Sequence, residues 1–249
     1  MRQERAIMGM PISIEIVDVD VTQSDFDKVF DFFVYVDEKF STYKNSSETS
    51  QINQGIIREN EYSDDMKEVI RLCSETARQT NGYFTTVALD ASFDPLGLVK
   101  GWAIYKASLI LDDLGLKNYF IEAGGDVQTK GKNINGENWN VGIRNPFVKN
   151  EIIKVLYLSG QGIATSGTYA RGQHIVNTLK PNLPITEIVA LTVVGPNIYE
   201  ADRFATAAFA MGKDGINFIE KLEYLEGYMV DNLGIATYTT GFEKLTQKI

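Results

Sequence analysis

The stretch Tyr119-Phe120-Ile121-Glu122-Ala123-Gly124-Gly125-Asp126 bears directly on the fold class of this chain. Its first half has the apolar character of a buried strand, and a pair of glycines follows directly. Paired glycines seldom improve the interior of a strand, but they let the backbone turn sharply or lie against a planar group. Both interpretations are open from the sequence. The first gives a tight hairpin, the short connection that antiparallel strands permit.

Outward from this stretch, helical and strand patterns alternate irregularly. Residues 11–19 alternate isoleucine with polar residues, which is the period of a half-buried strand. After a Ser24-Asp25 cap, a stripe at helical spacing predicts a core helix: Phe26, Val29, Phe30, Phe33, Val36 and Phe40. Further helices are expected over about 64–80, 99–114 and 200–211, and after Asp214; further strands are expected over 119–121, 139–143, 152–159 and 187–194. This irregular order favours a mixed α+β domain over a doubly wound parallel sheet.

The composition excludes several classes of protein. The chain has 249 residues, 44% hydrophobic and 23% charged, with a net charge of −9 that argues against a non-specific nucleic-acid binder. No apolar run approaches the roughly 20 residues that span a bilayer, so we expect no membrane insertion. The start of the chain lacks the apolar core of a signal peptide, which predicts a cytoplasmic protein. The single cysteine, Cys73, falls in an apolar helical stripe and is expected to pack in the core.

The only histidine of the chain, His174, lies in Ala164-Thr165-Ser166-Gly167-Thr168-Tyr169-Ala170-Arg171-Gly172-Gln173-His174-Ile175-Val176-Asn177. Histidine changes charge near neutral pH without help from its surroundings, so any imidazole acid–base step must use this residue. The simpler alternative is a loop histidine that only donates hydrogen bonds.

The run Asp94-Pro95-Leu96-Gly97-Leu98-Val99-Lys100-Gly101-Trp102-Ala103 indicates a turn that leads into a helix. Lys100 is expected in the first helical turn, where free backbone N–H groups and the helix dipole favour an anion. Gly97 permits close backbone approach, so its carbonyl could face a ligand or an ion. A plain strand-to-helix turn with a solvated lysine fits the spacing equally well.

The run Glu200-Ala201-Asp202-Arg203-Phe204-Ala205-Thr206-Ala207-Ala208 places a carboxylate and a hydroxyl four residues apart. On a helix, Asp202 and Thr206 would share one face, as hard oxygen ligands of the kind Mg2+ selects. The alternative is a capping aspartate with a threonine bonded to its own helix. Neither a P-loop motif nor a Rossmann glycine motif is present.

Taken in order, these runs resemble the ApbE family, the FAD:protein FMN transferases. The other matching runs are Met8-Gly9, Phe40-Ser41-Thr42-Tyr43 with Ser47-Glu48 and Ile52-Asn53, Asn81-Gly82-Tyr83-Phe84-Thr85, and Trp139-Asn140-Val141-Gly142-Ile143-Arg144-Asn145-Pro146. The resemblance covers nearly the whole chain, 1–249, and looks like the short cytoplasmic members. It implies a single compact, T-fold-related α+β domain with a mainly antiparallel sheet and packed helices.

The same resemblance implies FAD as substrate and Mg2+ on its pyrophosphate. Gly97 would give a backbone carbonyl to the metal, and Asp202 and Thr206 would give side-chain oxygens. The residues that would contact FAD are Met8, Tyr43, Tyr83, Phe84, Thr85, Asp94, Lys100, His174 and Val176. Two departures concern nucleotide recognition: Phe84-Thr85 stands where members often have Phe-Asp, and Asn177-Thr178 where they have Asp-Pro.

The implied reaction transfers FMN from FAD to a Ser/Thr hydroxyl of an acceptor flavoprotein and releases AMP. His174 is the first candidate for the general base, with Asp126 or Asp202 as alternatives. An FAD pyrophosphatase and a non-catalytic flavin-binding protein are the competing functions. The chain lacks the acceptor motif of the family, so we expect the acceptor to be a different protein.

Overall fold

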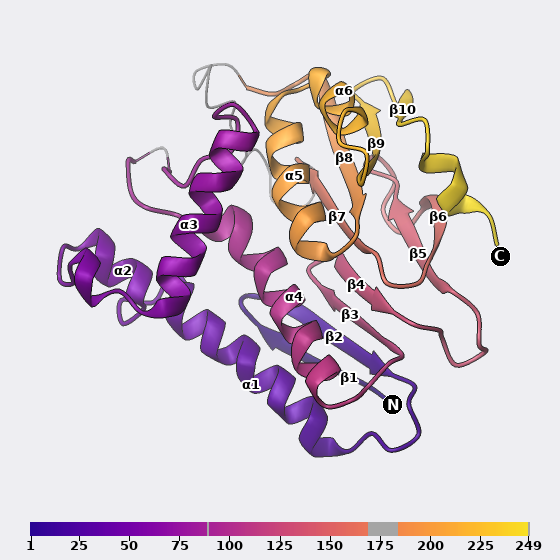
Figure 1. Ribbon diagram of the computed structural model, residues 1–249. Helices are drawn as coiled ribbons and strands as arrows, with labels where there is room; N and C mark the ends of the chain where they lie inside the picture. The colour runs from indigo at the N-terminus through magenta and orange to yellow at the C-terminus, as the bar shows by residue number, and fades with distance from the viewer. Residues whose placement is uncertain (89, 169–183, 249) are drawn as a thin grey trace.

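The computed structural model describes residues 1–88, 90–168 and 184–248 (Figure 1). The strands in these residues are β1 (Arg2–Ile7), β2 (Met10–Ile16), β3 (Tyr119–Ala123), β4 (Asp126–Lys130), β5 (Trp139–Arg144), β6 (Ile152–Leu158), β7 (Gly162–Gly167), β8 (Ile188–Gly195), β9 (Glu226–Asp231) and β10 (Ala236–Tyr238). The α-helices are α1 (Gln23–Phe40), α2 (Glu48–Asn53), α3 (Asp64–Gln79), α4 (Leu96–Asp113), α5 (Ile198–Ala210) and α6 (Asp214–Glu220). Short 3-10 helices span Glu59–Glu61 and Phe242–Thr246.

Eight of the strands form one sheet in the order β1-β2-β3-β4-β7-β8-β9-β10, and β5 pairs with β6 in a separate ribbon. Every neighbouring pair in both sheets is antiparallel. The expected α+β fold with a mainly antiparallel sheet and packed helices is therefore confirmed. No helix of the described part of the chain is long and apolar enough to cross a membrane.

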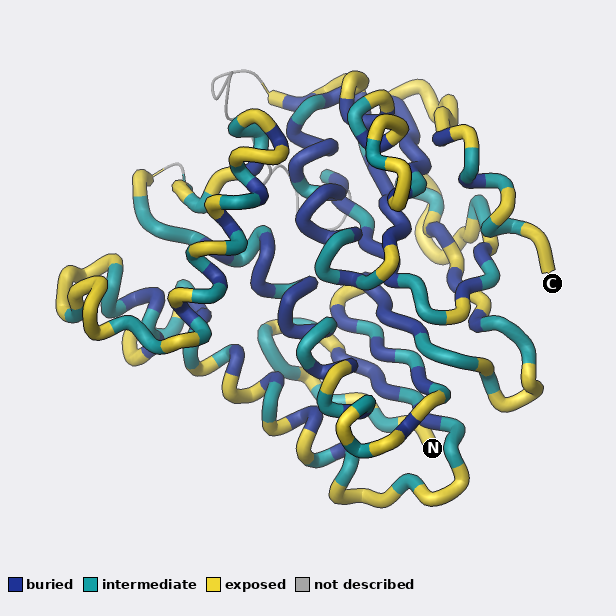
Figure 2. Tube along the Cα trace, in the orientation of Figure 1, coloured by how far each residue is buried: buried dark blue, intermediate teal, exposed yellow. Residues whose placement is uncertain are grey.

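The large sheet is covered on both faces, which gives two separate cores. One core joins the sheet to α1, α3, α4 and α5, and the second lies between the sheet and the β5–β6 ribbon. Strand β8 contributes to both, because Leu191 faces the helices and Ala190 faces the ribbon. Figure 2 shows the consequence, since the central strands and the inner helices are the buried parts of the trace. The sheet thus packs between the helices on one face and the β5–β6 ribbon on the other.

The expected core stripe of α1 is confirmed, since all six of its residues are buried. The cap lies earlier than Ser24-Asp25: Thr22 is the N-cap, and Asp25 accepts hydrogen bonds from the Thr22 backbone and hydroxyl at 2.8 Å each. Asp25 is therefore the third residue of the helix, where a carboxylate completes a capping box. Cys73 is buried as expected, and burial raises the pKa of its thiol to about 12.

The paired glycines form the hairpin, as one of the two interpretations predicted. Strands β3 and β4 pair from Ala123 and Asp126 outward, with Gly124 at φ 59° and Gly125 at φ 96°. Positive φ at both central residues is what a type I′ hairpin turn of two residues needs, and glycine adopts it without strain. The turn sets Asp126 at the first position of β4.

Candidate functional site

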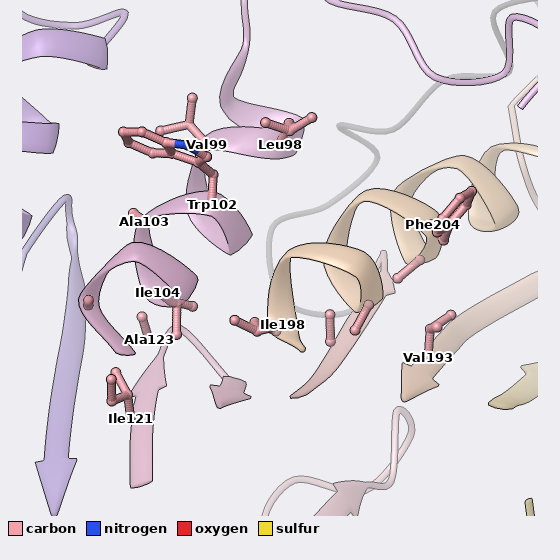
Figure 3. Packing of buried hydrophobic residues seen from close by; sticks show 14 of the residues in the cluster. Leu98, Val99, Trp102, Ala103, Ile104, Ile121, Ala123, Val193, Ile198 and Phe204 are labelled. Carbon is pink, nitrogen blue, oxygen red and sulfur yellow. The ribbon is translucent and has the colours of Figure 1, made fainter. Parts of the chain in front are cut away.

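Helices α4 and α5 cross closely at one point, and glycine makes the crossing possible. A Cβ atom added at Gly101 would lie 2.6 Å from Cβ of Asp202 and 3.0 Å from the Ile198 carbonyl oxygen. One turn earlier, a Cβ at Gly97 would lie 3.7 Å from Cγ2 of Thr206 and 3.4 Å from the Phe84 ring. Figure 3 shows the two helices beside each other, with Leu98 to Ile104 on α4 and Ile198 and Phe204 on α5. The pair Gly97 and Gly101 on α4 therefore meets the pair Asp202 and Thr206 on α5.

A cluster of three charged groups, two buried carboxylates and a lysine whose side chain is 21% exposed, lies beside this crossing. The Lys100 ammonium is 2.5 Å from Oδ2 of Asp126 and 3.7 Å from Oδ1 of Asp202. The residues Asp126 and Asp202 are only 2% and 4% exposed. The backbone N–H of Thr165 donates to Oδ1 of Asp126 at 3.1 Å, and that of Gly101 donates to Oδ2 of Asp202 at 2.8 Å. Residues from α4, β4, β7 and α5 thus assemble one charged site.

The electrostatic balance of this cluster is negative, because two carboxylates share one ammonium group. Burial raises the pKa of Asp202 to about 7; Lys100 lowers this pKa and the charge of Asp126 raises it. Oδ2 of Asp126 is buried without any hydrogen bond from the described residues, although it has the ion pair. A buried site that lacks positive charge is suited to hold a further cation.

The three residues expected to bind Mg2+ lie close to this crossing. Asp202 and Thr206 lie on the same face of α5, and Gly97 lies opposite Thr206. Mg2+ usually takes one or two carboxylates and completes its shell with water and substrate phosphate, so a carboxylate, a hydroxyl and a carbonyl form a suitable set. The described residues contain no group of three His, Cys, Asp or Glu side chains that could hold a metal ion.

The alternative interpretation of Asp202 as a helix-capping residue is wrong, because this residue does not cap α5. Asn197 is the N-cap, and its side chain accepts a hydrogen bond from the Glu200 N–H at 2.9 Å. Asp202 therefore lies inside the helix, where its buried carboxylate faces Gly101 and Lys100. A buried carboxylate in a helix interior is costly and so indicates a specific role.

The expectation that Lys100 lies in the first turn of its helix is also wrong. Helix α4 begins at Leu96, so Lys100 is its fifth residue. The Asp94 carboxylate accepts from the Leu96 N–H at 2.9 Å, and the Pro95 carbonyl accepts from Leu98 and Val99. The Asp94 side chain allows the helix to start earlier because it satisfies one of the free N–H groups. Lys100 thus acts through its side chain in the buried cluster.

The other predicted FAD contacts lie at different depths. Phe84 is buried against Gly97, Tyr83 is half-buried and Thr85 is exposed. Met8 is partly buried in the β1–β2 turn, at φ 56°. Tyr43 is 91% exposed, and the contacts described above do not bring it to the charged cluster. His174 and Val176 lie outside the described residues.

Sequence reasoning missed Gly101 and the backbone N–H of Thr165 as parts of this site. The spacing of Gly97 and Gly101 was a usable signal, because two small residues four apart present a groove for a neighbouring helix. The pairing of Lys100 with Asp126 had no local signal, since it depends on how β4 packs beneath α4.

These features define a class of protein: an α+β domain with a mainly antiparallel sheet and a largely buried cluster of one lysine and two aspartates. The sequence profile of the ApbE family matches residues 8–91 and 85–229. The chain belongs to the ApbE family.

The curated relatives of the chain include several FAD:protein FMN transferases. It is 29% identical over 167 residues to the FAD:protein FMN transferase of Haemophilus influenzae, covering 62% of this chain and 48% of that protein. It is 28% identical over 144 residues to the FAD:protein FMN transferase of Escherichia coli K12, covering 54% and 41%. The matched part thus spans about half the length of these curated relatives or less.

Solved structures show the same fold. The flavin transferase ApbE from Vibrio cholerae superposes with a TM-score of 0.86 at 19% identity, covering 98% of each chain. The ApbE protein from Thermotoga maritima superposes with a TM-score of 0.85 at 18% identity, covering 99% of each chain.

Proposed function

We propose that this protein transfers FMN from FAD to a serine or threonine hydroxyl of an acceptor flavoprotein and releases AMP, with Mg2+ as cofactor. The observation that carries the proposal is the buried cluster of Lys100, Asp126 and Asp202 beside the α4–α5 crossing. Membership in the ApbE family and relatives named FAD:protein FMN transferase support the choice of substrate.

In this proposal Asp202, Thr206 and the Gly97 carbonyl hold the metal ion. When bound, Mg2+ supplies Lewis-acid neutralisation of the pyrophosphate and of the leaving phosphate. The close approach of Gly101 to Asp202 fixes the carboxylate before any ligand arrives, because the Gly101 N–H donates to it at 2.8 Å. Ligands held in place in advance need little reorganisation during the reaction.

Lys100 contributes a fixed positive charge for the phosphates of FAD. Its ammonium lies 2.5 Å from Asp126, so the side chain is held within the site and does not move freely in solvent. Phosphoryl transfer depends mainly on positioning and on charge neutralisation, and an ion-paired lysine serves both. Asp94 is a second proposed contact with FAD. It lies just before α4, where its carboxylate also accepts a hydrogen bond from the Leu96 N–H.

The chemical step joins the acceptor oxygen to the FMN-side phosphorus and breaks the bond from that phosphorus to the AMP oxygen. AMP takes the bridging oxygen, and the proton of the attacking hydroxyl passes to a base. We assign that proton to His174 from the sequence. Asp126 is less suited to be the base, because both of its carboxylate oxygens are already engaged. One accepts a hydrogen bond from the Thr165 N–H, and the other faces the Lys100 ammonium.

Release of AMP tests the proposal against its alternatives. The protein is incubated with FAD and Mg2+, with and without a flavoprotein that carries a Ser/Thr flavinylation motif. AMP release that needs the acceptor supports a transferase. Equal release without it would mean an FAD pyrophosphatase, and no release with bound FAD would mean a flavin-binding protein.

A further inference from the structure

The side chain of Asn53, at the end of α2, holds a backbone segment 40 residues further along the chain. Its Nδ2 donates to the Phe93 carbonyl at 2.9 Å, and its Oδ1 accepts from the Phe93 N–H at 2.8 Å. One amide therefore satisfies both backbone groups of a single residue, as a neighbouring strand would. Two hydrogen bonds from one planar group fix orientation as well as distance.

Phe93 belongs to a small hairpin that leads into the proposed site. Val87 and Phe93 form an antiparallel bridge, and the Asp94 N–H donates to the Thr86 carbonyl at 2.7 Å. The first strand of this hairpin follows Phe84, whose ring lies against Gly97, and the second ends at Asp94. Two of the segments expected to contact FAD, one around Phe84 and the other at Asp94, are thus parts of one unit.

The described part of this hairpin contacts the core through Phe84, which is buried, and through Phe93, which is partly buried, while the turn between them is exposed. Its base is fixed by buried Phe84, which donates its N–H to the Thr80 hydroxyl at 3.1 Å. Val87 is 57% exposed, and the bonds between Asp90 and Ser92 are local to the turn. Among the described residues, the two hydrogen bonds between Asn53 and Phe93 join the second strand of the hairpin to α2.

We propose that Asn53 is a positioning residue, which pre-orders the segment of Asp94 and the start of α4 for FAD. The inference rests on the proposed function, because FAD is the ligand that this segment would contact. Without the amide, the segment must be ordered when FAD binds, and the ordering cost weakens affinity. Asn53 itself is exposed, so the core does not depend on it.

The test uses three variants of the full chain. Asn53→Ala removes both hydrogen bonds, and Asn53→Asp keeps the size but places a carboxylate oxygen against the Phe93 carbonyl. Asn133→Ala is the matched control. That asparagine accepts from two backbone N–H groups, at 2.9 and 3.1 Å, and donates to the Asn138 carbonyl at 3.1 Å. It follows β4 at the end of that strand opposite Asp126.

Hydrogen exchange on the free protein reports the clamp without any ligand. We expect faster exchange in peptides covering residues 90–94 of both Asn53 variants, and unchanged exchange there in Asn133→Ala. For FAD we expect a dissociation constant raised roughly tenfold in both Asn53 variants, which corresponds to about 1.4 kcal/mol. In turnover, KM for FAD should rise while kcat at saturating FAD stays within about twofold of wild type.

The outcomes separate this inference from the proposed function. If the wild-type protein does not bind FAD, the proposed function fails, and the exchange experiment still decides whether Asn53 orders the segment. If wild type binds FAD and the Asn53 variants bind equally well, the positioning role is wrong. Equal weakening by Asn133→Ala, or a fall in kcat without a change in KM, would also overturn it.

Discussion

Replacing Lys100 by methionine tests how strongly its ammonium group stabilises the two buried carboxylates beside it. Methionine has a similar length and fills the space, so the substitution removes the charge with little change in packing. It leaves Asp126 and Asp202, whose side chains are 2% and 5% exposed, without the ammonium group between them. Removing one partner of a buried ion pair costs about 3–5 kcal/mol, because the remaining charge has no compensation.

The expected loss depends on pH in a defined direction. The pKa of Asp202 is raised to about 7 in the folded protein, from a value near 3.8 when unfolded. A folded state that binds more protons than the unfolded state loses stability as pH rises between these two values. Removing Lys100 raises this folded pKa further, since Lys100 now lowers it. The destabilisation should therefore be larger at pH 8 than at pH 5.

Urea unfolding in the presence of EDTA, at both pH values, measures this effect. At pH 8 we expect Lys100→Met to lose about 3–5 kcal/mol of unfolding free energy. For a chain of this size each kcal/mol corresponds to a fall of about 2–4 °C in Tm. The double variant Lys100→Met/Asp126→Asn should recover part of the loss, because only one buried carboxylate remains. A loss below about 1 kcal/mol, or one that is independent of pH, would refute the reasoning, since that size is typical of an exposed pair.

Four other substitutions test the site. Asp202→Asn keeps an acceptor for the Gly101 N–H and should abolish Mg2+-dependent AMP release while the circular dichroism spectrum stays native; normal turnover would remove Asp202 from the metal site. Gly101→Ala should destabilise by about 1–3 kcal/mol in urea unfolding, because its Cβ would lie 2.6 Å from Cβ of Asp202. Gly97→Ala, with its nearest contact at 3.4 Å, should change stability by less than about 1 kcal/mol; equal losses would disprove the close crossing. His174→Gln should lower the transfer rate and flatten its rise with pH near about 6.5, with a modest effect on FAD affinity; an unchanged pH profile would exclude His174 as the base.

The sequence predicted the elements whose burial follows a regular period. The α1 stripe repeats at helical spacing and is buried as a unit, and the isoleucines of β2 alternate as expected. Strand β1 escaped prediction because it is an edge strand with charged residues and no buried side chain. Strand β4 escaped because it buries polar Gln128 and Thr129, which satisfy the backbone of neighbouring turns.

In the site too, the sequence predicted what depends on local spacing and missed what depends on tertiary contacts. The spacing of Asp202 and Thr206 placed both residues on one helical face, and the structure brings that face to Gly97 and Gly101. The start of α4 was misplaced because Asp94 satisfies a helical N–H with its side chain, which lets the helix begin directly after Pro95. Such a bond is visible in the sequence only as one possible cap among several.

Mass spectrometry of a purified acceptor flavoprotein, incubated with this protein, FAD and Mg2+, tests the proposed function most directly. We predict that the acceptor gains one FMN on a serine or threonine through a phosphoester bond, with one AMP released for each FMN attached. EDTA and Asp202→Asn should each prevent the modification while the protein remains folded. An acceptor that stays unmodified, although the wild-type protein binds both FAD and Mg2+, would contradict the account.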